Sequence, residues 1–292
     1  MLVLANDHIR LTLAPDYGAR VTELTDLATG RQWLVEGGFS SDVGEDAVYG
    51  ADPARGWDEC FPTVGVCSHP AWGGRMRDHG MLWGRPWEVV SIELDRVETR
   101  YSGLGFAFIR TLTLSANTIT ADYTVTNLGV AALPYLWSQH CLLATTPDDK
   151  ITKSGQGKMI AGNNAYDWPQ HPLRNLTTVG PITEGFALKS YAPTTGPAFA
   201  AITNPHGGIR FDWADVPAFG LWLSYGGWPE GAGVHQVALE PTTATADDLA
   251  LAEALGQARI LAPRETHRWQ VMITLIRPEI GPEIGPETRT LP

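Results

Sequence analysis

Short segments in which apolar and polar residues alternate recur along this 292-residue chain and restrict the folds that it can adopt. A repeat of two is typical of β-strands that bury one face, because successive side chains point to opposite sides. Many short strands separated by turns favour packed antiparallel sheets. We therefore predict an all-β fold, a large antiparallel β-sandwich. The alternating segments are residues 8–14, 19–27, 87–95, 106–114, 118–128, 199–203, 208–213, 219–225 and 268–276.

The sequence also predicts where the turns, a helix and the irregular segments lie. The 31 Gly and 21 Pro residues punctuate the strands, and residues 26–30 are typical of a hairpin turn. Only residues 246–255 favour a helix. Residues 37–84 and 145–172 lack a clear period and are expected to be irregular, and a long loop inside a compact domain is more often functional than idle.

The domain organisation is expected to be simple. No change in composition marks a boundary, so residues 1–277 are expected to form one domain. A tandem repeat, PEIGPEIGPE, follows in residues 278–287. Proline at every fourth residue is incompatible with a helix and weakens a strand, so we expect residues 278–292 to form a mobile tail.

Composition excludes several classes of partner. The formal net charge of -11 argues against a nucleic-acid backbone or an anionic membrane as a partner. No apolar stretch reaches transmembrane length, and the first residues are not typical of a signal peptide. Three cysteines without such a signal suggest a reducing compartment, so we expect a cytoplasmic protein. We also expect it to be a monomer or a homodimer. The spacing of Cys60, Cys67 and His69 matches no standard zinc pattern, so we expect free thiols and no metal.

Three residues are candidates for proton transfer. Glu240 follows an alternating strand and precedes Pro241, so we expect the strand to end there with the carboxylate facing a cleft. A solvated carboxylate at a strand end would give the same pattern. His140 closes an apolar strand, where burial and neighbours would set its pKa. His79 lies in the sequence RDHGMLW. A Glu that faces a His can take a proton from one atom and deliver one to another.

The order and context of these residues resemble the aldose 1-epimerase (galactose mutarotase-like) superfamily. The resemblance covers most of the chain up to the C-terminal repeat. It rests on GARVTELTDLATGRQWL near the start, on GWDECFPTVG, on HG before a W-x-V strand, on the histidine that closes LPYLWSQH, and on a late EP dipeptide. Each motif alone is weak, but their order is fairly specific.

The resemblance implies a role for each candidate. Glu240 would be the base that removes the proton from the C1 hydroxyl of an aldose, and His140 the acid that protonates the ring oxygen. His79 would hydrogen-bond the sugar near that oxygen. No cofactor or metal is implied, since only protons move. The other residues expected to contact the sugar are Trp57, Asp58, Arg77, Trp83 and Glu184.

Departures from the family pattern leave the substrate open. The family usually carries an Arg-containing segment before the first histidine, where this chain has WDECFPTVG, and Cys141 follows His140 where proline is usual. A hexose 6-phosphate substrate would need cations, which Arg75, Arg77 and Arg85 would supply. A carbohydrate-binding protein without turnover is a further alternative. A hydrolase or lyase is disfavoured, because a hydrolase normally needs two carboxylates and the sequence offers one convincing candidate.

Overall fold

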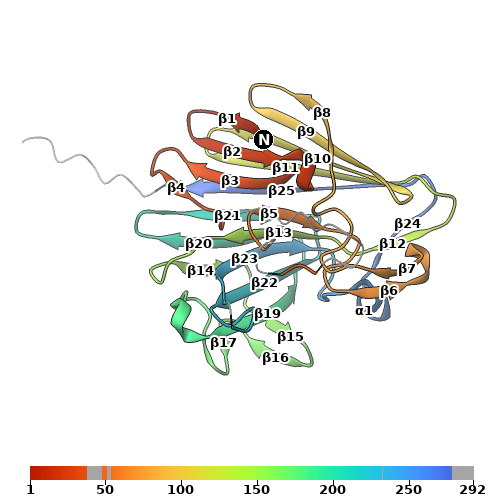
Figure 1. The fold of residues 1–292 in the computed structure, drawn as a ribbon. Helices are drawn as coiled ribbons and strands as arrows, with labels where there is room; N and C mark the ends of the chain where they lie inside the picture. Colours follow the sequence, from red (N-terminus) through yellow and green to blue (C-terminus); the bar gives the residue numbers. More distant parts are fainter. Residues whose placement is uncertain (38–47, 51–53, 232, 278–292) are drawn as a thin grey trace, which may run out of the picture.

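Two large antiparallel sheets make up most of the computed structural model, which describes residues 1–37, 48–50, 54–231 and 233–277 (Figure 1). One sheet has eleven strands and the other has eight. This architecture confirms the predicted all-β sandwich. The predicted mobile tail lies outside the described residues.

The eleven-stranded sheet carries the strands that matter most for the site. Its order is β1-β2-β3-β5-β13-β23-β22-β19-β15-β16, with β4 paired to β3. Figure 1 shows β5, β13, β23, β22 and β19 following one another down the picture. The strands are β1 (Leu2–Ala5), β2 (Ile9–Ala14), β3 (Arg20–Asp26), β4 (Arg31–Gln32), β5 (Trp57–Cys60), β13 (Ser138–Leu143), β15 (Lys158–Ala161), β16 (Asn164–Asp167), β19 (Phe186–Pro193), β22 (Ala218–Tyr225) and β23 (His235–Thr242).

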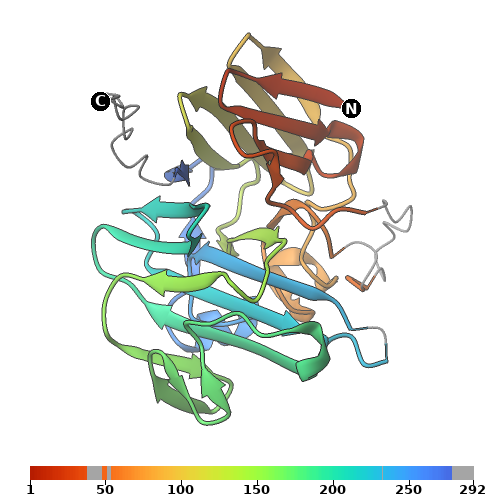
Figure 2. The same ribbon diagram turned by 90° about the vertical axis from the view of Figure 1, so that its left-hand side faces the viewer.

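The eight-stranded sheet packs behind it, as the turned view shows (Figure 2). Its order is β14-β20-β21-β25-β11-β10-β9-β8. The strands are β8 (Glu88–Ile92), β9 (Arg96–Gly103), β10 (Phe106–Ser115), β11 (Thr118–Asn127), β14 (Lys150–Lys153), β20 (Ala198–Asn204), β21 (Gly207–Trp213) and β25 (Thr266–Ile276).

Short elements fill the connections. Three two-stranded sheets pair β6 (Cys67–His69) with β7 (Gly74–Met76), β12 (Leu133–Tyr135) with β24 (Arg259–Leu261), and β17 (Gln170–His171) with β18 (Arg174–Asn175). The helices are α1 (Leu249–Ala254) and the 3-10 turns η1 (Pro15–Tyr17), η2 (Pro70–Trp72) and η3 (Ile182–Glu184). Among the described residues, no helix combines the length and apolar character that a membrane span requires.

Aromatic side chains join the two sheets. The Trp137 and Trp269 rings lie 4.9 Å apart and the Tyr123 and Trp137 rings 4.8 Å apart, measured between centroids. Tyr123 belongs to β11 and Trp269 to β25, while Trp137 immediately precedes β13. Alternation along each strand directs these residues into the interior, where aromatic burial is a major source of stability.

A buried polar cluster lies within this apolar core. Glu59 on β5 is fully buried and accepts hydrogen bonds from Arg110 (3.1 Å), Tyr123 (3.0 Å), Trp57 Nε1 (3.0 Å) and Trp137 Nε1 (2.9 Å). Burial raises the pKa of the Glu59 carboxyl to about 7, against the opposing effect of the Arg110 guanidinium. The four donors come from both sheets, so the cluster fixes the position of β5 relative to the second sheet.

All nine alternating segments form strands, as predicted. Residues 8–14 contain β2, 19–27 contain β3 and 87–95 contain β8. Residues 106–114 and 118–128 match β10 and β11, and the last four segments match β20, β21, β22 and β25. The turn at residues 26–30 closes with a hydrogen bond from the Gly30 amide to the Asp26 carbonyl (2.8 Å). The predicted helix forms but begins at Leu249, because Asp248 caps it by accepting from the Leu251 amide.

Two predictions about local structure are wrong. Strand β23 does not end at Glu240 but continues through Pro241 to Thr242, because β13 and β22 pair with it on both sides up to that residue. Residues 37–84 and 145–172 are not simply irregular. The first contains β5, β6 and β7, and the second contains β14, β15 and β16.

The Glu59–Arg110 pair provides a test of this core. We expect Arg110→Met to lower the free energy of unfolding by about 3–5 kcal/mol, because it leaves a buried carboxylate without its counter-ion. Adding Glu59→Gln should make the double variant cost less than the sum of the two single changes. Urea unfolding measures all three variants.

The control is Arg210→Met, which removes a half-exposed pair with Asp212 and should cost about 1 kcal/mol or less. An Arg110→Met protein as stable as this control would contradict the structural role of the pair.

Candidate active site

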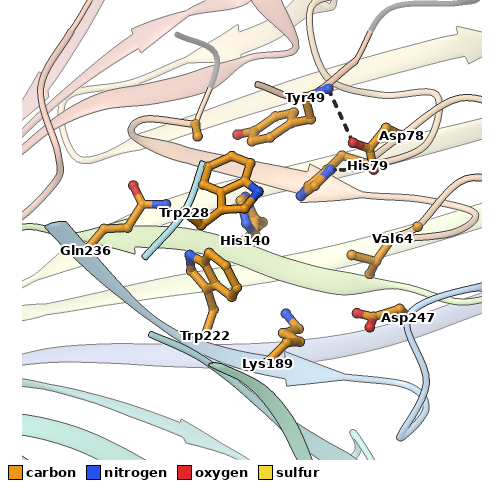
Figure 3. Close-up of a pocket in the computed structure, with 12 residues that line it drawn as sticks. Tyr49, Val64, Asp78, His79, His140, Lys189, Trp222, Trp228, Gln236 and Asp247 are labelled. Atoms are coloured by element: carbon orange, nitrogen blue, oxygen red, sulfur yellow. Dashed lines mark hydrogen bonds and ion pairs between the residues drawn. The ribbon is translucent and has the colours of Figure 1, made fainter. Parts of the chain in front are cut away.

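A cavity of about 300 Å³ lies on the face of the eleven-stranded sheet that points away from the core. Its size is at the lower end of the range for small-molecule sites. Figure 3 shows side chains from β13, β19, β22 and β23 converging on it with residues from the loops before β5 and after β7. The residues used below are Tyr49, His79, His140, Lys189, Trp222 and Asp247.

Strand register aligns the floor of this cavity. Ser138 pairs with Thr242 and Leu142 with Ala238, so the register places His140 opposite Glu240. His140 also pairs with Asp58 on β5. Glu240 pairs with Gly220 on β22, and Gly220 with Tyr191 on β19. Directly paired residues share one face of a sheet with Cβ atoms about 4.5–5.5 Å apart, so these side chains form one row.

Gly220 leaves room in this row for the Glu240 carboxylate. A Cβ atom at residue 220 would lie 3.0 Å from Glu240 Oε2 and 3.2 Å from the Tyr191 ring. A side chain there would therefore press on the carboxylate. The glycine thus lets the Glu240 carboxylate lie close to β22, and a larger residue would have to displace it by a few tenths of an ångström.

Glu240 is fully buried beneath the cavity. Its Oε2 atom accepts hydrogen bonds from Ser138 Oγ (3.2 Å) and from the Lys189 ammonium, which lines the cavity. Its Oε1 atom is buried without a hydrogen-bond partner among the described residues. The carboxylate thus has one oxygen engaged by a cation and one still able to accept a proton.

His140 lines the cavity and is only 5% exposed. Its Nδ1 atom is buried without a partner among the described residues. Burial lowers the pKa of the imidazole well below 6.5, and the nearby His79, Lys189 and Arg20 lower it further. His140 is therefore neutral in the empty site at physiological pH, with one ring nitrogen as a donor and the other as an acceptor.

His79 is positioned by the turn that contains it. The Gly80 backbone touches the Phe61 backbone so closely that a Cβ atom would lie 2.2 Å from the Phe61 carbonyl oxygen. His79 itself has a φ of 57°, which is uncommon for a residue other than glycine. Its Nδ1 atom lies 3.0 Å from Asp78 Oδ1, and its ring stacks on Tyr49 with centroids 3.8 Å apart (Figure 3). The Nε2 atom is left to face the cavity.

Asp58 serves chiefly to hold the site together. Arg20 donates two hydrogen bonds to its carboxylate (2.9 and 2.7 Å), and the Tyr49 hydroxyl donates a third (2.6 Å). All three side chains are buried. The carboxylate is therefore engaged by the protein itself, and it anchors Tyr49, which in turn packs on His79.

Like Asp58, four other residues predicted to bind substrate do not line the cavity. Trp57 lies on the opposite face of β5 and is buried in the core, because side chains alternate along a strand. Arg77 is buried and donates to the Gly80 and Trp83 carbonyls. Trp83 lies under Tyr49, with its ring edge-on at 5.1 Å. Glu184 is in η3, where it pairs with Arg174 at 2.5 Å.

Several lining residues were missed by the sequence analysis. Lys189 and Asp247 carry the charges, and the Tyr191 hydroxyl donates to the Asp247 carboxylate. Trp222 and Trp228 form an edge-to-face pair with centroids 5.7 Å apart. Trp222 had a detectable signal, because this large apolar residue occupies the polar phase of the alternating strand 219–225.

Cys67 and His69, which lie near Cys60 in the sequence, contact different partners. His69 Nε2 lies 3.0 Å from Glu253 Oε2, and Cys67 Sγ lies 3.7 Å from the Thr63 hydroxyl. All three cysteines are free thiols, as expected. Cys60 and Cys141 are buried, and Cys67 is partly exposed.

Comparison with known proteins gives matches in structure but none in sequence. No protein-family model matches the chain, and no curated protein matches it. A galactose mutarotase related enzyme from Lactobacillus acidophilus superposes with a TM-score of 0.72 at 15% identity, over 94% of this chain and 96% of the other. A galactose mutarotase-like protein from Lactobacillus casei gives a TM-score of 0.68 at 16% identity, over 94% and 99%.

A candidate aldose 1-epimerase from Escherichia coli K12 is also similar. Its TM-score is 0.71 at 19% identity, over 94% of this chain and 97% of the other. Identities this low support a shared fold and leave the activity open. The chain therefore has the galactose mutarotase-like fold.

Proposed function

We propose that the protein is an aldose 1-epimerase, which interconverts the α and β anomers of a free aldose. The observation that carries this proposal is the pairing register that sets His140 beside Glu240 at the cavity floor. A carboxylate and an imidazole on adjacent strands can take a proton from one atom of a small molecule and give one to a neighbouring atom. Anomer exchange requires this and no redox step.

In the proposed reaction, Glu240 removes the proton from the C1 hydroxyl while His140 delivers a proton to the ring oxygen. The C1–O5 bond breaks, and the open-chain aldehyde rotates about its C1–C2 bond. Reversal of the two proton transfers closes the ring as the other anomer. Glu240 Oε1, which is buried without a partner, is the natural acceptor for the hydroxyl proton.

The state of His140 shapes this mechanism. The imidazolium is the form that can deliver a proton to the ring oxygen, because a neutral imidazole that gave up its N–H would be left as an imidazolate anion. Burial lowers the pKa of His140 well below 6.5, so the imidazolium is a strong acid that is sparsely populated at neutral pH. The Nε2 atom of His79 is an acceptor when Nδ1 donates to Asp78, so His79 suits a sugar hydroxyl.

A free sugar fits the cavity better than a sugar phosphate. Of the described lining residues, Lys189 alone is a lysine or arginine, and its ammonium already bonds Glu240. Arg77 is buried and engaged by backbone carbonyls, so it does not provide the phosphate contact considered above. Trp222 and Trp228 instead offer broad apolar faces of the kind that pack against sugar C–H groups.

The second candidate is a sugar-binding protein of the same fold without turnover. The ion pair between Lys189 and Glu240 favours it, because the ammonium engages one oxygen of the carboxylate that an epimerase would use as its base. The two candidates differ in whether Glu240 affects a rate.

We expect Glu240→Gln to lower kcat for anomer exchange by roughly 100- to 10 000-fold, the usual contribution of a general base. The affinity for sugar should change little, because the variant removes only proton transfer. Polarimetry of freshly dissolved α-D-glucose and α-D-galactose measures the rate, and calorimetric titration measures binding.

Glu98→Gln on β9 is the matched control, since it makes the same change on the other sheet and should leave the rate unchanged. Wild-type protein that binds these sugars without accelerating their mutarotation would favour the binding protein. Equal rates for Glu240→Gln and wild type would refute the assignment of the base.

Lys189→Met tests the ion pair. Removing the ammonium leaves the buried Glu240 carboxylate without its counter-ion, so we expect the free energy of unfolding to fall by about 1–3 kcal/mol. Urea unfolding measures this change.

The matched control is Lys158→Met, because Lys158 pairs with Asp167 at an exposed position and its loss should cost about 1 kcal/mol or less. A Lys189→Met protein as stable as Lys158→Met would show that the pair does not hold the Glu240 carboxylate in place.

A further inference from the structure

Three potential metal ligands meet at the floor of the cavity, where His79 and His140 line it and Cys60 is buried next to them. Cys60, His79 and His140 each present one ligand atom, and these atoms all lie within 4.8 Å of one another. Cys60 is two residues after Asp58, the partner of His140, so its side chain lies on the same face of the sheet. This set differs from the Cys60, Cys67 and His69 spacing considered in the sequence.

The ligand atoms are available. His79 Nδ1 lies 3.0 Å from Asp78, which leaves Nε2 as the lone-pair atom directed toward His140 (Figure 3). His140 Nδ1 is buried and has no partner among the described residues. Cys60 is a buried free thiol.

The surroundings also match a metal site. Metal-binding histidines almost always donate their other ring nitrogen to a carboxylate or carbonyl, and Asp78 occupies that position for His79. Four carboxylates either line the cavity or hydrogen-bond a residue that lines it: Asp58, Asp78, Glu240 and Asp247. Two cations, Arg20 and Lys189, lie among them. The excess of carboxylates favours a divalent cation.

We propose that Cys60, His79 and His140 bind one zinc ion, with its fourth coordination position open to the cavity. Two imidazoles and one thiolate are a ligand set that zinc uses when one position is left for water or substrate. Zinc bonds of about 2.0–2.3 Å require the three atoms to approach by roughly 1 Å, which side-chain rotation supplies. The Cys60 thiol releases its proton when the ion binds.

Zinc in this site would block the groups that the proposed epimerase reaction uses. It occupies the lone pair of His140 and the atom of His79 that faces the sugar. If the proposed epimerase function is correct, zinc therefore inhibits anomer exchange in competition with the sugar. The binding of the ion itself does not depend on that function.

Cobalt(II) provides the direct test, because it replaces zinc and its thiolate complexes absorb light. Full-length protein is stripped of metal with a chelator, which is then removed, and titrated with Co²⁺ without oxygen. We expect one equivalent to produce a thiolate-to-cobalt charge-transfer band, and Zn²⁺ to abolish it. Cys60→Ser should lack the band, and Asp78→Asn should bind about 10- to 100-fold more weakly.

Cys67→Ser is the matched control, because Cys67 is a free cysteine outside the cluster, and it should keep the band. His79→Gln is a second ligand variant, for use in case Cys60→Ser does not fold. It should bind Co²⁺ more weakly than the wild-type protein. A wild-type protein without the band, or a band that survives in Cys60→Ser, would overturn the proposal. Absence of epimerase activity in the metal-free protein, with the band still forming when Co²⁺ is added, would refute the proposed function and leave the metal site standing.

Discussion

The register between β13 and β23 is the constraint on which the site depends, because it sets His140 beside Glu240. Side chains alternate along a strand, so a slip of one strand by one residue would turn one of the two groups into the core. The register is fixed next to the site, where the Thr242 hydroxyl donates to the Trp137 carbonyl (2.8 Å) and the Trp137 amide donates to the Thr243 hydroxyl (2.8 Å). The architecture of the sandwich thereby positions the chemistry.

Buried polar groups in this protein fall into two kinds. Glu59 and Asp58 are surrounded by donors, and their hydrogen bonds tie strands together. His140 Nδ1 and Glu240 Oε1 are buried without partners among the described residues. An unsatisfied buried group costs about 1–3 kcal/mol, and proteins accept such costs mainly at functional sites. Other buried atoms also lack a partner, among them Arg110 Nε in the Glu59 cluster, so the two unpartnered atoms mark the candidate site only together with the cavity beside them.

Alternation in the sequence predicts much of the fold but not all of it. It finds strands such as β10 and β11, which bury one face, and misses β5, where all four residues are buried and no alternation exists. His79, His140 and Glu240 were identified from their order and context. Lys189 and Asp247 were not, because they reach the cavity through the pairing of β19 with β22 and the packing of the Asp247 backbone on Val64 and Gly65. Such contacts have no local signal in the sequence.

The central claim is that this cavity exchanges sugar anomers through Glu240. Two-dimensional exchange NMR of an equilibrated aldose tests it most directly, because it detects interconversion of the α and β C1 signals without a pure starting anomer. The account predicts exchange cross-peaks between the anomers in the presence of wild-type protein and none with Glu240→Gln at equal sugar occupancy. Sugar bound in the cavity of the wild-type protein with no exchange above the spontaneous rate would contradict it.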